Sequence, residues 1–375
     1  MRVKAAVLRT VGAPTPYATS RPLDITEVEL APPGRGEVLV RLKATGLCHS
    51  DLSVMNGDRP RPVPMVLGHE SAGIVVALGA GVEGLAVGDH VVTAFVPSCG
   101  HCGPCVAHRP ALCEPGFAVN SAGTLLSGER RWSDGNTALH HHLGISGFAD
   151  HAVMAAESLV RIAPDLPWEI AAVFGCAVLT GVGAVVNTAQ VQAQHSVAVV
   201  GLGGVGLAAL LGARAVGARE ILAVDLHQDK LDLAARLGAT RTFNASDPNC
   251  ADALRAATGG GVDFAFEMAG SVRALDLAWN ITRRGGTTVT AGLAPPTAQF
   301  NLSPVKLVAE ERTLKGSYIG SCVPQRDIPK FIQWYREGRL PVDALLAERL
   351  RLDELNEGFD RLATGHTVRQ VVVFD

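Results

Sequence analysis

The chain has 375 residues, of which 47% are hydrophobic and 18% charged, and its formal net charge is −3. This composition indicates a folded globular protein rather than a disordered chain, and it gives no reason to expect nucleic acid or an anionic membrane as a partner. The length exceeds that of one ordinary hydrophobic core, so we expect two domains.

Two apolar segments bear on where the protein resides. The amino-terminal sequence MRVKAAVLRTVG reaches Arg9 too early to contain a secretory apolar segment, so we expect no signal peptide and a cytoplasmic protein. No charged residue lies between residues 170 and 194, but polar side chains interrupt the second part of this run. A buried α/β core gives apolar stretches of the same length, so we expect no membrane span.

The first half of the chain consists of short β-type segments between glycine and proline turns. Examples are residues 38–43, 72–76, 90–94 and 160–162. Such a pattern predicts a β-rich domain of barrel or sandwich type. We place this domain at residues 1–177 and expect a cysteine-rich loop within it at residues 97–115.

From about residue 178 the pattern changes to an alternation of strands and helices. Strands are predicted at 196–200, 221–225, 241–243, 262–267 and 287–291, with helices between them at 205–216, 230–237, 250–257 and 272–281. This alternation predicts a parallel, doubly wound sheet over residues 178–320. The tail, 321–375, then contains two amphipathic helices, at 328–337 and 352–363, and a last strand at 370–374.

The segment SVAVVGLGGVGLAALLGARAVGAREILAVD predicts a dinucleotide site. Gly201, Gly203 and Gly206 follow an apolar strand and open a helix, and Asp225 closes the next strand at the expected distance. The pyrophosphate would lie at the helix amino terminus, and the Asp225 carboxylate would accept ribose hydroxyls and repel a 2′-phosphate, which favours NAD over NADP. A glycine-rich turn without a ligand is the alternative. The candidate cofactor residues here are Gly201, Gly203, Gly204, Val205, Gly206, Asp225 and Lys230.

Four of the eight cysteines lie in one short loop, as Cys99, Cys102, Cys105 and Cys113. Four thiolates at this spacing suit a closed tetrahedral zinc site, which would stabilise the loop and have no position for a substrate. Disulfides are a poor alternative in a reducing compartment. An iron–sulfur cluster is a better one, although the Cys-Pro that follows in ferredoxins is absent.

A second, scattered set consists of Cys48 in TGLCHSD, His69 in VLGHE and Cys176 in FGCAVLTG. Each has a glycine-flanked or apolar setting and could be a buried structural residue, as such residues usually are. Their spacing alone cannot bring them together.

The sequence resembles the zinc-dependent alcohol dehydrogenases of the medium-chain dehydrogenase/reductase family, in their long-spacer, liver-type branch. The segments that carry the resemblance run in family order across most of the chain: TGLCHSD, LGHESAGIVVALGAGVEGLAVGDHVV, CGHCGPCVAHRPALC, GCAVLTGVGA, VVGLGGVGLAAL and VDLHQDKLDLAARLGAT. The resemblance implies a GroES-like β-rich catalytic domain and a Rossmann NAD-binding domain.

The resemblance also implies the roles of individual residues. Cys48, His69 and Cys176 would be the catalytic zinc ligands, a Cys₂His set known for alcohol dehydrogenases. Asp51 would orient His69, and Glu70 would lie behind the metal. Ser50 would take the alcohol proton into a relay, while His49 and Arg369 would hold the cofactor pyrophosphate. Two zinc ions per chain are implied, one catalytic and one structural, and the metal would lower the pKa of a bound alcohol while hydride passes to NAD.

Two positions depart from the family pattern. Ser53 stands where liver-type members have the histidine that ends the proton relay, so the terminal group of the relay is not identified. Cys113 is followed by Glu114, Pro115 and Gly116 instead of the arginine of the glutathione-dependent branch, which disfavours a glutathione adduct as substrate.

The remaining residues give weaker expectations. Four apolar residues align with pocket positions and suggest a bulky aromatic, allylic or terpenoid alcohol, although plain core packing is an alternative; they are Phe95, Leu112, Leu293 and Ile319. The triplet 140–142, three histidines, is expected to be a solvated or partly packed loop. Cys250 and Cys322 are expected to be buried thiols.

We therefore predict reversible oxidation of a primary alcohol to the aldehyde with NAD, with a small alcohol or aldehyde as the partner. Three alternatives remain: a formaldehyde dehydrogenase that uses a low-molecular-weight thiol, an enzyme that keeps NAD(H) bound through turnover, and a non-catalytic NAD-sensing protein. A homodimer is expected from the family, and a tetramer is the alternative.

Overall fold

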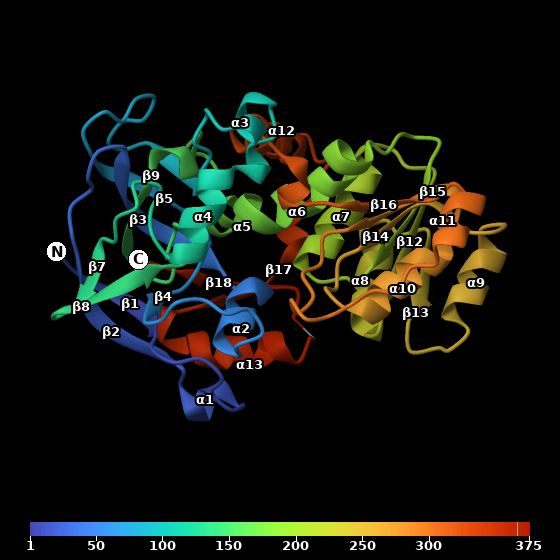
Figure 1. The fold of residues 1–375 in the computed structure, drawn as a ribbon, viewed down its shortest axis with the longest axis horizontal. Helices are drawn as coiled ribbons and strands as arrows, with labels where there is room; N and C mark the ends of the chain where they lie inside the picture. Colours follow the sequence, from blue (N-terminus) through green and yellow to red (C-terminus); the bar gives the residue numbers. More distant parts are fainter. Residues whose placement is uncertain (366) are drawn as a thin grey trace. The chain divides into compact units, whose positions relative to one another are not determined.

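The computed structural model describes residues 1–365 and 367–375, and the chain divides into two compact units. Unit 1 contains Met1–Cys176, Val323–Pro329 and Leu346–Asp375, and unit 2 contains Ala177–Cys322 and Lys330–Leu345. The chain therefore completes a β-rich half, builds the second unit and contributes its last residues to the first unit (Figure 1).

Five strands of unit 1 close into a small barrel in the order β1-β2-β7-β8-β4. At the start of β1 Val3 and Ala5 are buried while Arg2 and Lys4 are exposed, the alternation of a strand with one face toward water, whereas residues 6–8 are buried on both faces. β1 pairs antiparallel with β2 over its whole length. The barrel strands are β1 (Arg2–Leu8), β2 (Leu23–Leu30), β4 (Met65–Val66), β7 (Trp132–Asp134) and β8 (Thr137–His141).

A seven-stranded sheet forms the rest of the β structure of unit 1, and β3 lies at its centre. β3 pairs with β5, β9 and β18, and its alternate side chains Val38, Val40 and Leu42 are fully buried. Val371 of β18 lies opposite Gly46, so the last strand of the chain runs beside the end of β3. The strands are β3 (Glu37–Gly46), β5 (Glu70–Leu78), β6 (His90–Thr93), β9 (His151–Ala155), β10 (Leu159–Ile162), β17 (Leu346–Leu350) and β18 (Arg369–Val373).

Two helices of unit 1, α2 (His49–Met55) and α13 (Leu355–Ala363), contribute side chains to a buried core. Leu47, Met55, Phe148 and Phe359 belong to one buried core, where the rings of Phe148 and Phe359 meet edge to face at 5.9 Å. Burial of large apolar side chains of this kind is the main stabilising term of such a unit. Its helices are α1 (Tyr17–Ser20), α2 (His49–Met55), α3 (Gly103–Val106), α4 (Glu114–Ala122), α5 (Trp168–Val173) and α13 (Leu355–Ala363).

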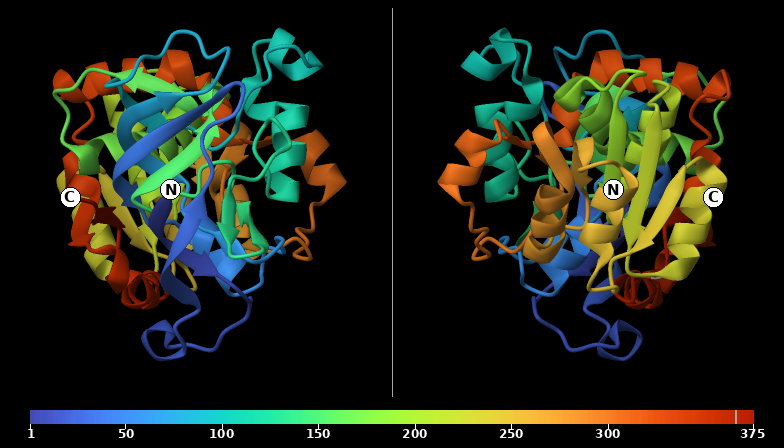
Figure 2. Two further views of the ribbon diagram at one scale, coloured as in Figure 1. Left: turned by 90° about the vertical axis from the view of Figure 1, so that its left-hand side faces the viewer. Right: turned by 90° about the vertical axis from the view of Figure 1, so that its right-hand side faces the viewer.

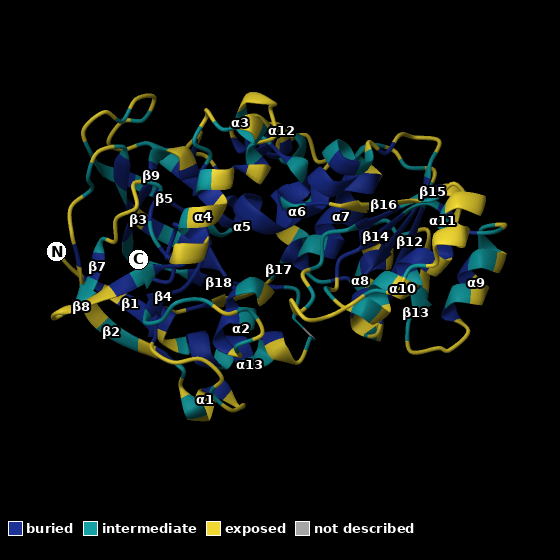
Figure 3. Ribbon diagram, viewed as in Figure 1, coloured by how far each residue is buried: buried dark blue, intermediate teal, exposed yellow. Residues whose placement is uncertain are grey.

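Unit 2 is built on a six-stranded sheet in the order β13-β12-β11-β14-β15-β16, and all five neighbouring pairs are parallel. The middle strands are buried on both faces, whereas α9 and α11 carry exposed residues (Figure 3). The strands are β11 (Ser196–Val200), β12 (Glu220–Asp225), β13 (Arg241–Asn244), β14 (Val262–Glu267), β15 (Thr282–Thr290) and β16 (Thr313–Gly316). The helices are α6 (Leu179–Gly183), α7 (Gly204–Ala215), α8 (Gln228–Leu237), α9 (Cys250–Ala257), α10 (Val272–Ile281) and α11 (Pro304–Ala309), and α12 (Pro324–Arg336) is divided between the units.

The predicted fold class is confirmed. A β-rich unit with a closed barrel precedes a parallel, doubly wound sheet whose helices flank it (Figure 2). The predicted bounds of β11, α9, β14 and α10 agree with the structure, and those of α7, α8 and β13 differ by one or two residues at an end. The sixth strand of the sheet, β16, was not predicted.

One helical run among the described residues, Trp168–Ala189, is long and apolar enough to cross a membrane by length and composition. It consists of α5, a π-helical turn at Phe174–Val178, α6 and a second π-helical segment at Ala184–Ala189. In its most apolar window 89% of the residues are buried inside the protein. Burial in the protein interior therefore accounts for this uncharged stretch.

Candidate functional site

Three elements of unit 1 position Cys48, His69 and Cys176. Cys48 lies between the end of β3 and the first residue of α2, as its strand-to-helix sequence predicts. His69 directly precedes β5, after Gly68, whose φ of 90° and contact with the backbone of Phe148 leave no room for a side chain. Cys176 lies in the π-helical turn Phe174–Val178.

The three side chains meet at one point, although the sequence separates them widely. Their ligand atoms lie within 4.8 Å of one another, and all three residues are buried. Cys176 Sγ lies 3.6 Å from His69 Nε2. Zinc at about 2.3 Å from sulfur and about 2.05 Å from nitrogen, with a tetrahedral angle, requires about 3.6 Å between these atoms. Two thiols and one imidazole in this arrangement therefore fit a zinc ion.

Asp51, in the first turn of α2, orients His69. His69 Nδ1 lies 3.2 Å from Oδ1 and 3.1 Å from Oδ2 of the fully buried Asp51, and the Gly68 N–H donates to Oδ1 at 3.0 Å. Because a carboxylate only accepts, Nδ1 of His69 carries the proton and Nε2 keeps its lone pair toward the two sulfurs. Burial opposes ionisation of Asp51, but the neighbouring histidines lower its pKa to about 2.

Glu70 and Arg369 form a buried pair beside this cluster. Glu70 Oε2 lies 3.1 Å from Arg369 Nη1, which also donates to the Leu47 carbonyl at 2.6 Å. Burial raises the pKa of Glu70 to about 8, and the positive charge of Arg369 opposes this shift. Arg369 was expected to hold a cofactor pyrophosphate, and within unit 1 its guanidinium faces Glu70.

The two thiols of the cluster differ electrostatically. The contact with Cys176 lowers the pKa of Cys48, and although burial opposes this shift, His69 and Arg369 add to it. The same contact with Cys48, together with burial, raises the pKa of Cys176. Thiolate is the form in which cysteine binds a metal, and the neighbouring charges of His69 and Arg369 favour it at Cys48.

The four cysteines of the loop also converge. They are free thiols with sulfur atoms within 4.8 Å of one another, and Cys102 Sγ lies 3.9 Å from Cys113 Sγ. Tetrahedral zinc requires about 3.8 Å between two sulfurs. Backbone N–H groups of Cys99 and Gly116 point at Cys113 Sγ, at 3.3 and 3.4 Å, and such donors stabilise thiolate charge. The loop therefore fits a four-thiolate metal site.

The predicted dinucleotide loop has the expected backbone in unit 2. Gly201 has a φ of 91°, and a Cβ at Gly206 would overlap the Gly201 carbonyl, whereas the space beside Gly203 is open. Asp225 ends β12, and its carboxylate accepts the N–H groups of Leu202 at 2.6 Å and His227 at 3.0 Å. The open space over Gly203 and the start of α7 form a cradle that fits a pyrophosphate.

The other predicted site residues have varied positions. His49 is exposed at the start of α2, Ser50 follows it partly exposed, and Lys230 is buried in α8. Phe95 is nearly buried, and its ring meets that of His69 edge to face at 5.3 Å. Of the other pocket candidates, Leu112 and Leu293 are exposed and Ile319 is buried, while Cys250 and Cys322 are buried thiols, as predicted.

The expectation that the histidine triplet lies in a solvated or partly packed loop is wrong: His140 and His141 belong to β8, and His141 and His142 are buried. His141 ends β8 and is fully buried, and its Nε2 accepts the Arg131 N–H at 3.1 Å. His142 is 2% exposed, and its Nε2 lies 3.2 Å from Asp51 Oδ1. His142 is therefore a neighbour of the metal cluster that the sequence did not reveal, because only tertiary pairing of the segments brings it to Asp51.

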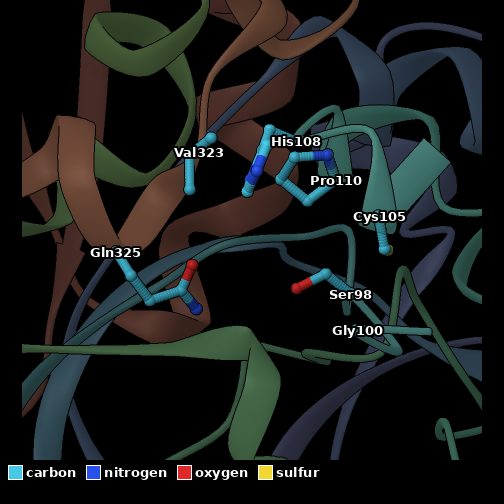
Figure 4. Close-up of a pocket in the computed structure, with 7 residues that line it drawn as sticks. All are labelled: Ser98, Gly100, Cys105, His108, Pro110, Val323 and Gln325. Atoms are coloured by element: carbon cyan, nitrogen blue, oxygen red, sulfur yellow. The ribbon is translucent and has the colours of Figure 1, made fainter.

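A separate hollow of about 180 Å³ lies against the four-cysteine loop (Figure 4). None of its lining residues belongs to the Cys48 cluster, so it is not a candidate for the reaction site. They are Ser98, Gly100, Cys105, His108, Pro110, Val323 and Gln325.

Two family models match the chain. Residues 34–165 match the alcohol dehydrogenase GroES-like domain, and residues 204–337 match the zinc-binding dehydrogenase domain. The first match contains His69 and the four-cysteine loop, and the second begins within the glycine-rich turn.

Several known proteins resemble the chain over its whole length. It is 35% identical to the S-(hydroxymethyl)glutathione dehydrogenase of Paracoccus denitrificans, and the alignment covers 100% of both chains. The benzyl alcohol dehydrogenase of Acinetobacter calcoaceticus has the same fold, with a TM-score of 0.93, 32% identity and coverage of 100% of both chains. An alcohol dehydrogenase zinc-binding domain protein of Burkholderia ambifaria also gives a TM-score of 0.93, at 35% identity over 100% of this chain and 99% of that one. With the convergent metal-ligating side chains and the parallel nucleotide-binding sheet, these matches establish that the chain belongs to the zinc-dependent alcohol dehydrogenases of the medium-chain dehydrogenase/reductase family.

Proposed function

We propose that Cys48, His69 and Cys176 hold a catalytic zinc ion and that the four-cysteine loop holds a second, structural one. The observation that carries this proposal is the burial of the three side chains at a spacing that matches tetrahedral zinc. Three protein ligands leave a fourth position for substrate, whereas four thiolates close the loop site. Zinc, when bound, lowers the pKa of an alcohol and polarises a carbonyl oxygen.

We propose NAD as the hydride acceptor, held by the turn between β11 and α7. The Asp225 carboxylate is fixed by two backbone N–H groups at the end of β12, which is the position from which a carboxylate contacts the adenosine ribose. Its negative charge disfavours the 2′-phosphate of NADP. Gly204, Val205 and Lys230 are proposed as further contacts of this cofactor.

The chain's own residues then have defined tasks. Asp51 fixes the His69 imidazole with Nε2 toward the sulfurs, and the Ser50 hydroxyl is proposed to take the alcohol proton as it passes its own proton on to water. Ser53 cannot take the proton onward as a histidine would, since a hydroxyl titrates far above neutral pH. His49 and Arg369 are proposed to bind the cofactor pyrophosphate, as in the family pattern.

We propose a primary aromatic or allylic alcohol as the substrate. The rings of Phe95 and His69 meet edge to face, with centroids 5.3 Å apart, so an apolar aromatic side chain adjoins the proposed metal. Similarity to a benzyl alcohol dehydrogenase supports the same class. Phe95, Leu112, Leu293 and Ile319 are proposed to contact the substrate.

The second candidate substrate is S-(hydroxymethyl)glutathione or a similar thiol adduct, because relatives with that activity are 35–37% identical. The sequence after Cys113 argues against glutathione itself, since Glu114, Pro115 and Gly116 include no arginine that could hold a substrate carboxylate. Purified protein should be assayed with NAD against benzyl alcohol, and against formaldehyde with and without glutathione. A kcat/KM at least tenfold higher for benzyl alcohol supports the first proposal, and turnover of formaldehyde only in the presence of glutathione refutes it.

We further propose that unit 2 is the NAD-binding part, that unit 1 is the catalytic part, and that the protein is a cytoplasmic homodimer. These proposals rest on the family resemblance. Gel filtration with light scattering tests the dimer, and a mass of one or four chains would contradict it.

A further inference from the structure

A short turn after β8 carries His142 toward the metal cluster. The His142 carbonyl accepts the N–H groups of Ile145 and Ser146 at 3.0 and 3.2 Å, and the His142 N–H donates to Ser146 Oγ at 3.1 Å. Leu143 and Ser146 both have left-handed backbone conformations, with φ of 51° and 57°. A side-chain-bearing residue adopts this conformation only at an energetic cost, so the surrounding contacts must impose the path of the turn.

The end of this turn is fixed to the segment that carries His69. The Gly147 N–H donates to the Gly68 carbonyl and the Phe148 N–H to the Leu67 carbonyl, both at 2.9 Å. These two bonds lie directly before His69 in the sequence. The position of His142 is therefore tied through the backbone to the position of His69.

The imidazole of His142 reaches the carboxylate that orients His69. Its Nε2 lies 3.2 Å from Asp51 Oδ1, and its ring meets the His69 ring at 5.4 Å with the planes 73° apart. Because Oδ1 only accepts, Nε2 of His142 carries the proton and Nδ1 keeps a lone pair. Among the described residues neither ring nitrogen of His142 has a partner in full hydrogen-bond geometry, so Nε2 approaches Oδ1 closely but without good alignment; burial lowers the pKa of His142 although Asp51 opposes this shift.

Asp51 Oδ1 thus faces donors from two other segments: the Gly68 N–H and His69 Nδ1 on one, and His142 Nε2 on the other. The first two donors come from adjacent residues, and His142 Nε2 approaches the same oxygen from an independent segment at 3.2 Å. This third contact adds a restraint on the orientation of the carboxylate. Outer partners of this kind hold a ligating imidazole in the orientation that the metal requires.

We propose that His142 is a positioning residue of the metal centre, which holds the Asp51 carboxylate in the orientation that directs His69 Nε2 to the ion. The inference rests on the proposed role of His69 as a zinc ligand. Two other roles for His142 compete with this one. In the first, its ring only fills space and its N–H has no role. In the second, His142 binds a further metal ion together with Asp51 and His69, since the ligand atoms of these three residues also lie within 4.8 Å of one another.

Two variants distinguish these three roles. His142→Phe keeps a ring in the same volume but removes the donor, whereas His142→Gln places an amide N–H near the position of Nε2. His141→Gln is the matched control, because His141 is equally buried, adjoins His142 and bonds to the Arg131 N–H instead of Asp51. Gel filtration and near-UV circular dichroism check that each variant folds.

The main readout is the rate at which a chromogenic chelator removes the labile zinc from the purified holoenzyme. The second is the visible absorption of protein in which cobalt replaces the catalytic zinc, because these bands report ligand orientation independently of turnover. We expect His142→Phe to release the metal about tenfold faster, in the range for loss of an outer partner, and to shift the cobalt bands. His142→Gln and His141→Gln should remain within about threefold of the wild type.

Three results would overturn the inference. Equal release rates for wild type and His142→Phe, with two zinc ions in each, would overturn it alone. Impairment of His142→Gln equal to that of His142→Phe would assign His142 to packing, and loss of a third metal ion from His142→Phe would make it a ligand. Wild-type protein with one zinc per chain would overturn the proposed function as well, and thus distinguishes the two failures.

Discussion

β14 has a carboxylate near each end, Asp263 at the amino end and Glu267 at the carboxyl end, and the two accept hydrogen bonds from different segments. At the carboxyl end, Glu267 Oε1 accepts the N–H groups of Ala269 at 2.8 Å and Gly270 at 2.6 Å, and Oε2 accepts the Thr290 hydroxyl at 2.7 Å. At the amino end, Oδ2 of Asp263 accepts the N–H of Ser196 at 2.7 Å and its hydroxyl at 2.8 Å. Oδ1 of Asp263 accepts Arg283 Nε–H at 2.6 Å. Arg283 Nη2 also lies 2.6 Å from Asp263, so Glu267 has three close donors and Asp263 has four.

We predict that Glu267→Gln weakens both the fold and cofactor binding, whereas Asp263→Asn weakens only the fold. Hydrogen bonds to a charged group contribute about 1.5–3 kcal/mol each, so complete loss of the two backbone bonds of Glu267 would cost about 3–6 kcal/mol. The amide keeps one acceptor oxygen, so we expect a loss of about 1–2 kcal/mol for either variant. Ligands of parallel sheets bind at the carboxyl ends of the strands, where Glu267 fixes the loops after β14 and β15. We therefore expect only Glu267→Gln to raise the Kd for NADH, about tenfold.

The assay pairs urea denaturation, followed by circular dichroism, with titration of NADH fluorescence. Both variants should lose similar unfolding free energy, which controls for a general weakening of the sheet. Equal Kd values for NADH in the two variants, or unchanged NADH binding in Glu267→Gln at the expected loss of stability, would refute the reasoning that Glu267 shapes the cofactor site.

Three further outcomes test the assignments. Cys48→Ser should lower the zinc content from two ions to one and reduce kcat/KM at least a thousandfold, while NADH still binds. Cys250 is a buried thiol outside both clusters, so Cys250→Ser should change neither the zinc content nor kcat/KM. Asp225→Asn should raise the ratio of kcat/KM for NADP to that for NAD about tenfold, and an unchanged ratio would contradict the role of this carboxylate. Burial lowers the pKa of His141 to about 3, and the charge of Arg131 adds to this shift. Between pH 6.5 and 3 the unfolded chain therefore binds a proton that the folded protein does not. As the pH decreases through this range, the free energy of unfolding falls by about 1.4 kcal/mol per pH unit. His141→Gln should lose less unfolding free energy than the wild type as the pH decreases. Urea denaturation at pH 7, 6 and 5 measures this loss, and the same loss in both proteins would contradict the prediction.

Local patterns were sufficient for much of unit 2. α9, α10 and β14 are bounded by residues whose preference agrees with their position, such as Ser271, whose hydroxyl accepts the Ala274 N–H at the start of α10. β16 was missed because TLKG is short and polar, and it forms a strand only through pairing with β15. Strand formation of that kind depends on the neighbour and not on propensity.

The site was predictable to a different extent. The four-cysteine loop and the glycine-rich turn are local in sequence, so their spacing alone indicates their chemistry. Cys48, His69 and Cys176 required family resemblance, because no local pattern relates a strand end, a strand start and a helix turn. The family resemblance did not predict the position of His142. Its contact with Asp51 depends on a turn whose left-handed residues, Leu143 and Ser146, give no recognisable sequence signal.

The π-helical turn Phe174–Val178 has a consequence for how this protein can vary. A π turn contains one residue more than an α turn, and each residue of a helix rotates the side-chain direction by about 100°. Deleting one residue from the turn would let the helix become regular and would swing Cys176 away from His69, while the neighbouring backbone bonds improved. A regular α-helix and metal ligation by Cys176 are thus incompatible at this position. The segment should therefore tolerate substitutions far better than insertions or deletions.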